Sequence, residues 1–122
     1  MNDLKLFVID SDLALRVLFE ELYKDRVYTL EDLTDVGFRL PDFSPELVLV
    51  DSKLYLADPE AANKSLEVCA DIPCTLVGFQ EEVEKARSRG WEKAVLLKPL
   101  EVSTLKGRLG DLHAQLSKET SR

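Results

Sequence analysis

Three short apolar runs, each followed directly by a charged residue, constrain the fold of this 122-residue chain more than any other feature. The run Leu4–Ile9 precedes Asp10, Leu47–Val50 precedes Asp51, and Val95–Leu97 precedes Lys98. Short runs rich in Val, Leu and Ile are typical of strands buried on both faces of a parallel sheet covered by helices. Because the carboxyl ends of parallel strands share one edge of the sheet, we expect the three charged side chains to meet there.

Two carboxylates and one amine at such an edge indicate a site for a divalent cation and a phosphate group. Each group alone also has a simpler interpretation. A carboxylate at a strand end is commonly a helix cap, and a lysine there is commonly a solvated charge. The joint occurrence of all three groups favours the site.

Composition limits the classes of protein to which the chain can belong. Its length is that of one domain, and 45% hydrophobic residues suffice for a single core, expected over residues 1–116 with a flexible tail over 117–122. The formal charge of −7 argues against direct binding to nucleic acid or to an anionic membrane. No apolar run approaches the roughly 18 residues of a membrane span, and no basic leader is seen, so the expected localisation is cytoplasmic.

Cysteine and histidine usage narrows the possible chemistry. Cys69 and Cys74 flank a predicted helix-to-strand turn, where reduced core thiols are more common than a disulfide in a domain of this size. His113 is the only histidine, which excludes a histidine-based metal cage and a two-histidine catalytic site. The carboxylates and the lysine at the strand ends therefore remain the main candidates.

Hydrophobic periodicity alternates between strand and helix along the whole chain. Further strands are predicted over Val27–Leu30 and Ile72–Val77, and a loop is predicted between Asp51 and Asp58. The first predicted helix runs from the cap Asp12 to Tyr23 or Lys24, and a second, over 31–38, is cut short by Gly37, Pro41 and Pro45. A third helix is predicted from Pro59 to Cys69 with Asp58 as its cap. The last two are predicted from Glu81 to Arg89, before Gly90, and from Val102 to Gln115. Five strands alternating with helices predict a doubly wound α/β fold with right-handed crossovers.

Several motifs follow one another in a characteristic order. The first is the acidic turn Asp10-Ser11-Asp12, followed by Arg16 and Leu18. The second is the run Pro45–Asp51, with Asp58 seven residues after its last residue. The third consists of Ile72-Pro73 and, further on, Gly90 followed by Val95–Pro99. Together they resemble the receiver domain of two-component response regulators over essentially the whole chain. The resemblance implies a flavodoxin-like fold, with five parallel strands in the order 2-1-3-4-5 and helices on both faces.

The resemblance also implies roles for the residues at the strand ends. Asp51 would accept a phosphoryl group, and Lys98 would be its phosphate partner. The implied cofactor is Mg²⁺, held weakly by Asp10, Asp51, the backbone carbonyl of Lys53 and, to a smaller extent, Ser11. A carboxylate and a phosphoryl donor are both anionic, so their reaction needs the cation and the lysine. Slow self-dephosphorylation is the only catalysis implied, and receivers commonly hold the bond after this lysine in cis.

Three positions depart from the family pattern. Ser11 stands where most receivers have a second acid, which removes a charge that would hold Mg²⁺. Gly78 stands where the family has a Ser or Thr whose hydroxyl follows the phosphate. Val95 stands where a switching Tyr or Phe is usual. These losses count against switching by phosphorylation.

Two other residues have open interpretations. Trp91 stands where a small residue is usual, so it is either a core plug or an exposed anchor for a partner. The ammonium group of Lys53 offers an alternative to a metal, since it would neutralise Asp10 and Asp51 directly.

Two hypotheses of different classes result. The first is a phosphoaccepting receiver of a bacterial phosphorelay, which takes its phosphoryl group from a histidine kinase or a phosphotransfer protein. It would thereby change its binding to a downstream effector or to a second copy of itself, through the family's output surface on the fourth helix, fifth strand and fifth helix. The second is a pseudo-receiver, a protein-interaction module that acts without phosphorylation. A nucleotide- or flavin-binding enzyme is a weaker third hypothesis, because the first strand-to-helix turn has no glycine-rich phosphate loop.

Overall fold

Five parallel strands form one sheet in the computed structural model, which describes residues 4–120. They are β1 (Leu6–Ile9), β2 (Val27–Leu30), β3 (Leu47–Asp51), β4 (Cys74–Gly78) and β5 (Ala94–Leu97). Their order across the sheet is β2-β1-β3-β4-β5, and every neighbouring pair is parallel. This arrangement confirms the predicted flavodoxin-like, doubly wound fold.

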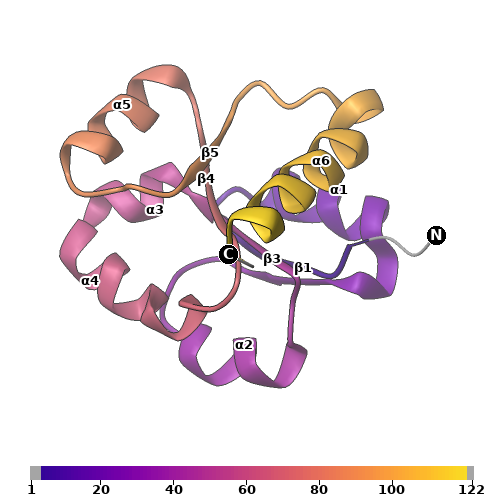
Figure 1. Ribbon diagram of the computed structural model, residues 1–122, viewed down its shortest axis with the longest axis horizontal. Helices are drawn as coiled ribbons and strands as arrows, with labels where there is room; N and C mark the ends of the chain where they lie inside the picture. Colours follow the sequence, from indigo (N-terminus) through magenta and orange to yellow (C-terminus); the bar gives the residue numbers. More distant parts are fainter. Residues whose placement is uncertain (1–3, 121–122) are drawn as a thin grey trace.

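Helices cover both faces of this sheet. They are α1 (Leu13–Tyr23), α2 (Val36–Phe43), α3 (Ser52–Ala57), α4 (Pro59–Ser65), α5 (Gln80–Ser88) and α6 (Val102–Thr120), with the 3₁₀ turns η1 (Lys24–Arg26) and η2 (Leu66–Cys69). Helices α1 and α6 lie together on one face, and α2 to α5 lie on the other (Figure 1). Among the described residues, no helix combines the length and the apolar character that a bilayer span requires.

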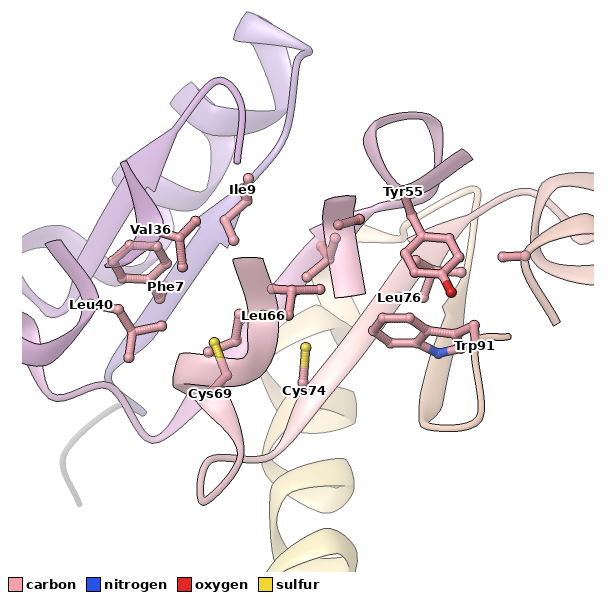
Figure 2. Packing of buried hydrophobic residues seen from close by; sticks show 14 of the residues in the cluster. Phe7, Ile9, Val36, Leu40, Tyr55, Leu66, Cys69, Cys74, Leu76 and Trp91 are labelled. Atoms are coloured by element: carbon pink, nitrogen blue, oxygen red, sulfur yellow. The ribbon is translucent and has the colours of Figure 1, made fainter. Parts of the chain in front are cut away.

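The sheet separates two hydrophobic cores, because successive side chains of a strand point to opposite faces. In β1, Leu6 and Val8 face α1 and α6, whereas Phe7 and Ile9 face the other helices. The core between the sheet and helices α2 to α5 is called the second core below. Figure 2 shows it, and its side chains include Val36, Leu40, Tyr55, Leu66, Leu76 and Trp91. Burial on both faces explains why β1 and β3 are almost entirely apolar in sequence.

Trp91 lies inside this second core. Its side chain is 3% exposed, and its indole N–H donates to the Ala94 carbonyl over 3.0 Å. Its ring meets Tyr55 edge to face, with the ring centroids 5.2 Å apart (Figure 2). Gly90, directly before it, has a φ of +111°, as predicted for the residue that ends a helix. The interpretation of Trp91 as a core plug is therefore right, and the exposed anchor is wrong.

Cys69 and Cys74 are buried and free, as expected for core thiols (Figure 2). Burial raises the pKa of Cys69 to about 11 and that of Cys74 to about 12. Both side chains therefore stay neutral and unreactive at physiological pH.

Three local predictions were wrong. The predicted loop after Asp51 is the helix α3, because the Asp51 carboxylate caps it. Helix α2 contains Pro41, which was expected to lie beyond the helix. This proline removes the hydrogen bond to the carbonyl of Gly37, which is an exposed residue. Helix α6 continues to Thr120, beyond its predicted end at Gln115, and residues 121–122 of the predicted tail lie outside the described part.

Candidate functional site

Asp10 and Asp51 lie next to each other at the carboxyl edge of the sheet. The register of β1 and β3 pairs Ile9 with Val50, directly before the two acids. Each acid is only 2% exposed. Burial is the main cause that raises the pKa of Asp10 from 3.8 to about 6, and the negative charge of Asp51 adds to it. The fold therefore brings the two predicted carboxylates together in surroundings that disfavour two negative charges.

The Asp51 carboxylate accepts three hydrogen bonds. Its Oδ2 accepts from the Ser11 hydroxyl (2.8 Å) and from the Ser11 N–H (3.2 Å). Its Oδ1 accepts from the Lys53 N–H (2.9 Å), and this bond makes Asp51 the N-cap of α3. A carboxylate has about four acceptor sites, so about one is left for a cation or a phosphoryl group.

The turn after β1 fixes Asp10 and directs Asp12 elsewhere. The Asp12 N–H donates to Asp10 Oδ1 (2.8 Å), which lowers the pKa of Asp10. The Asp12 carboxylate accepts from the Ala14 N–H (2.9 Å) as the N-cap of α1. The Arg16 guanidinium donates to the main-chain carbonyl of Asp10 (2.7 Å). Asp12 therefore caps a helix, as predicted, and the side chain that reaches Asp51 from this turn is the neutral hydroxyl of Ser11.

Lys53 presents its backbone N–H to the site. In a helix the carbonyl groups point toward the C-terminus, so the Lys53 carbonyl points away from Asp51 in this conformation. It would face a metal only if the first turn of α3 unwound. The Lys53 side chain is exposed and makes no ion pair of 4.0 Å or less with the described residues. Its ammonium group therefore does not neutralise the two acids in this conformation.

Lys98 leaves β5 on the other side of the site. Its peptide bond to Pro99 is cis, as expected from the resemblance, and its N–H donates to the Gly78 carbonyl (2.8 Å). The ammonium group lies over the Phe79 ring, 5.7 Å from the centroid. The charge of Lys98 lowers the pKa of Asp10, so it acts on the acid pair. Within the described part of the chain, it makes no ion pair of 4.0 Å or less.

The position of Gly78 is filled by a neighbour. A Cβ on Gly78 would collide with the Ser52 Oγ and lie 2.6 Å from the Ser52 Cβ. The Ser52 hydroxyl donates to Glu82 Oε1 (2.9 Å). Sequence analysis missed Ser52 and Glu82, and the only signal was a glycine where a hydroxyl is usual. Val95, on β5, is half-buried against the second core and brings no polar group to the site.

The donor set at the acid pair meets the minimum for Mg²⁺. This cation prefers oxygen ligands, keeps several waters and typically takes one or two carboxylates. Asp10 and Asp51 provide two, with the Ser11 hydroxyl beside them. Within residues 4–120, no group of three or more His, Cys, Asp or Glu side chains is placed to hold a metal. A cation would therefore depend on this one pair and on water.

Solved structures with the same fold are receiver domains. NtrX from Brucella abortus, solved in complex with ATP, matches with a TM-score of 0.71 and 21% sequence identity. The match covers 95% of this chain and 28% of the NtrX chain. The signal receiver domain of a Bacteroides fragilis response regulator has a TM-score of 0.69 and 17% identity, over 88% of this chain and 94% of its own. A two-component response regulator from Clostridium difficile has a TM-score of 0.70 and 14% identity, over 93% of this chain and 98% of its own.

No protein-family model matches the chain, and no curated protein sequence matches it. At these levels of identity the likeness concerns the fold alone. The strand order, the acid pair and the structural neighbours together lead to one conclusion: the chain has the fold of a response regulator receiver domain.

Proposed function

We propose that this chain is a phosphoaccepting receiver, in which Asp51 takes a phosphoryl group and thereby changes the binding of a partner. One observation carries the proposal: the register of β1 and β3 places Asp10 and Asp51 side by side, both buried, at the carboxyl edge of the sheet, where the charge of Lys98 also lowers the pKa of Asp10. Two buried acids and an amine are the groups that phosphoryl transfer to a carboxylate needs.

In the proposed reaction, an Oδ atom of Asp51 attacks the phosphorus atom of a phosphohistidine. The O–P bond forms as the P–N bond breaks, and the imidazole nitrogen keeps the electron pair and takes a proton from solvent. Lys98 would leave the Phe79 ring and bind the phosphoryl oxygens. Asp10 and Asp51 would hold Mg²⁺, which supplies the positive charge that lets two anions approach.

The proposed donor is a histidine kinase or a phosphotransfer protein, and the proposed receptor of the signal is an effector or a second copy of the chain. Support comes from the predicted output surface. The fourth helix, fifth strand and fifth helix expected from the sequence correspond to α5, β5 and α6 in the structure. Large exposed apolar side chains occur on or beside these elements, at Phe79, Leu97 and Val102. Phe79 also contacts Lys98, which connects this surface to the acid pair.

A pseudo-receiver is the second candidate, and a specific observation favours it. The Ser11 hydroxyl satisfies Asp51 without a metal, in the place where most receivers have a second acid. Fewer carboxylates bind Mg²⁺ less tightly, and without a cation the attack of one anion on another is slow. In this case the chain would bind its partner in one constitutive conformation.

Intact mass distinguishes the two candidates. The protein is incubated with an acyl phosphate donor and Mg²⁺, beside Asp51→Asn and the matched surface control Asp111→Asn. We expect a gain of one phosphoryl group in the wild type and in Asp111→Asn, and none in Asp51→Asn. Labelling that survives in Asp51→Asn would remove Asp51 from its role, and no labelling of any of the three proteins would favour the pseudo-receiver.

A further inference from the structure

Ser52 is a fully buried polar residue directly after the proposed phosphoacceptor. Its exposure is 0%, and its hydroxyl donates to Glu82 Oε1 over 2.9 Å. Ser52 is the first residue of α3, the helix that Asp51 caps, and Glu82 lies in the first turn of α5. This bond therefore joins the helix capped by Asp51 to the helix that follows β4.

The same carboxylate oxygen continues the connection. Glu82 Oε1 also accepts from the Phe79 N–H over 3.1 Å, at the start of α5. The Phe79 ring in turn lies under the Lys98 ammonium group. A continuous series of contacts thus runs from Asp51 through Ser52, Glu82 and Phe79 to Lys98. It begins and ends on the two residues proposed to bind the phosphoryl group.

Gly78 allows this connection because it has no side chain. A Cβ there would collide with the Ser52 hydroxyl and lie 3.2 Å from Glu82 Oε1. A hydroxyl on residue 78 and the hydroxyl of Ser52 would therefore compete for one space and one partner. The glycine on β4 and the serine on α3 are two parts of one arrangement.

Extending the proposed function, we propose that the Ser52 hydroxyl couples Asp51 to the first turn of α5, in place of a hydroxyl on β4. Asp51 holds the first turn of α3 through the Lys53 N–H, so a change in the charge of its carboxylate shifts that turn. Ser52 transmits the shift to Glu82, and Glu82 transmits it to the Phe79 amide. Ser52 is a positioning residue in this scheme and does not touch the phosphoryl group.

The amide resonance of Phe79 tests this coupling in the full-length protein by NMR. Asp51→Asn removes the charge at nearly constant size, and we expect it to shift the Phe79 amide proton. In a Ser52→Ala background the same substitution should shift that proton by less than half as much. Thr75→Ala is the matched control, since it deletes another fully buried hydroxyl that lies outside this series of contacts, and the Phe79 response should persist there. A response of equal size with and without the Ser52 hydroxyl would overturn the proposal.

A pair of substitutions without a hydroxyl separates coupling from packing. Gly78→Ala alone should lower the midpoint of thermal unfolding, because the new Cβ collides with Ser52. Adding Ser52→Gly should recover most of that loss, since it empties the space, while the Phe79 response to Asp51→Asn stays as weak as in Ser52→Ala. A full response in this double variant, which has no hydroxyl at either position, would mean that the Ser52 hydroxyl does not carry the coupling.

These measurements use no phosphodonor. If Asp51 is not labelled in the mass experiment but the Phe79 amide responds through Ser52, the coupling holds and the proposed phosphorylation fails. If Asp51 is labelled but the Phe79 amide responds equally with and without the Ser52 hydroxyl, the phosphorylation holds and the coupling fails.

Discussion

The two halves of the site differ in how firmly the fold holds them. In the acid half, at the ends of β1 and β3, Asp10 and Asp51 are buried and accept hydrogen bonds from the neighbouring turn and from α3. In the lysine half, at the ends of β4 and β5, Gly78 has no side chain and the Lys98 ammonium group rests on an aromatic ring.

This difference has an energetic meaning. The acid half keeps two carboxylates out of water, which is unfavourable unless a cation is bound beside them. In the lysine half, the contact of an ammonium group with an aromatic ring contributes only about 0.5–2 kcal/mol, so that half rearranges more easily. Under the proposed function, the acid half would bind the cation, and a conformational response is expected in the lysine half.

The largest effect on stability is expected from Gly78→Ala in the lysine half. The new Cβ would meet Ser52, whose side chain is fully buried, and overpacking of this kind destabilises by about 3 kcal/mol. Gly107→Ala is the control, because a Cβ there meets nothing within 4 Å and alanine favours a helix by about 1 kcal/mol. Urea unfolding should show a lower free energy of unfolding for Gly78→Ala and a higher one for Gly107→Ala, each relative to the wild type. Equal effects would mean that Ser52 does not fill the space beside Gly78.

In the acid half, Asp10→Asn should stabilise the protein by about 2–3 kcal/mol at pH 7. The pKa of Asp10 is about 6 in the folded protein against 3.8, so the wild type loses stability as the pH rises from about 4 to about 6. Asparagine avoids this loss and can still accept from the Asp12 N–H. Urea unfolding at several pH values should show a gain that shrinks toward zero near pH 4. A gain independent of pH would contradict a buried, titrating carboxyl.

Ser11→Asp should turn the acid half into a stronger cation site. A third carboxylate beside the pair should raise Mg²⁺ affinity about tenfold, measured by calorimetry. Without the cation the same variant should be less stable at pH 7, because three negative charges would crowd together. Ser103→Asp, on the exposed start of α6, is the control and should leave the affinity unchanged. Unchanged affinity in Ser11→Asp would mean that the cation does not bind at this edge.

The smallest effect is expected from Lys53→Ala. The ammonium group is exposed and unpaired within the described residues, and the bond to Asp51 comes from the backbone, which alanine keeps. Mg²⁺ affinity should change by less than about fivefold, the range of a weak surface interaction. A larger rise in affinity on titration would instead support the hypothesis that Lys53 neutralises the acid pair.

The acid pair was predictable because it depends on local patterns. Apolar runs mark the buried strands, and a residue at the end of a parallel strand must lie at the carboxyl edge, so Asp10 and Asp51 could be brought together from the sequence. Helix caps also depend on local patterns and were predictable in the same way. Asp58 accepts from the Ala61 N–H as the predicted N-cap of α4.

The lysine half depends on contacts that no local pattern encodes. Ser52 and Gly78 lie on different elements, and only the packing of α3 against β4 shows that one fills the space of the other. The helix α3 was missed for a related reason. Sequence analysis favoured a phosphoacceptor role for Asp51 over a helix cap, whereas in the structure its carboxylate caps α3.

Trp91 is the only tryptophan in the chain, and its ring packs against Tyr55 in α3. The emission of a buried indole depends on the polarity and packing around it, so a shift of α3 alters the fluorescence of a single, unambiguous fluorophore. Any event that changes the charge of Asp51, the residue that caps this helix, should therefore be visible in the emission spectrum. The protein carries its own optical reporter, and binding or modification at the acid pair can be followed in real time without a label.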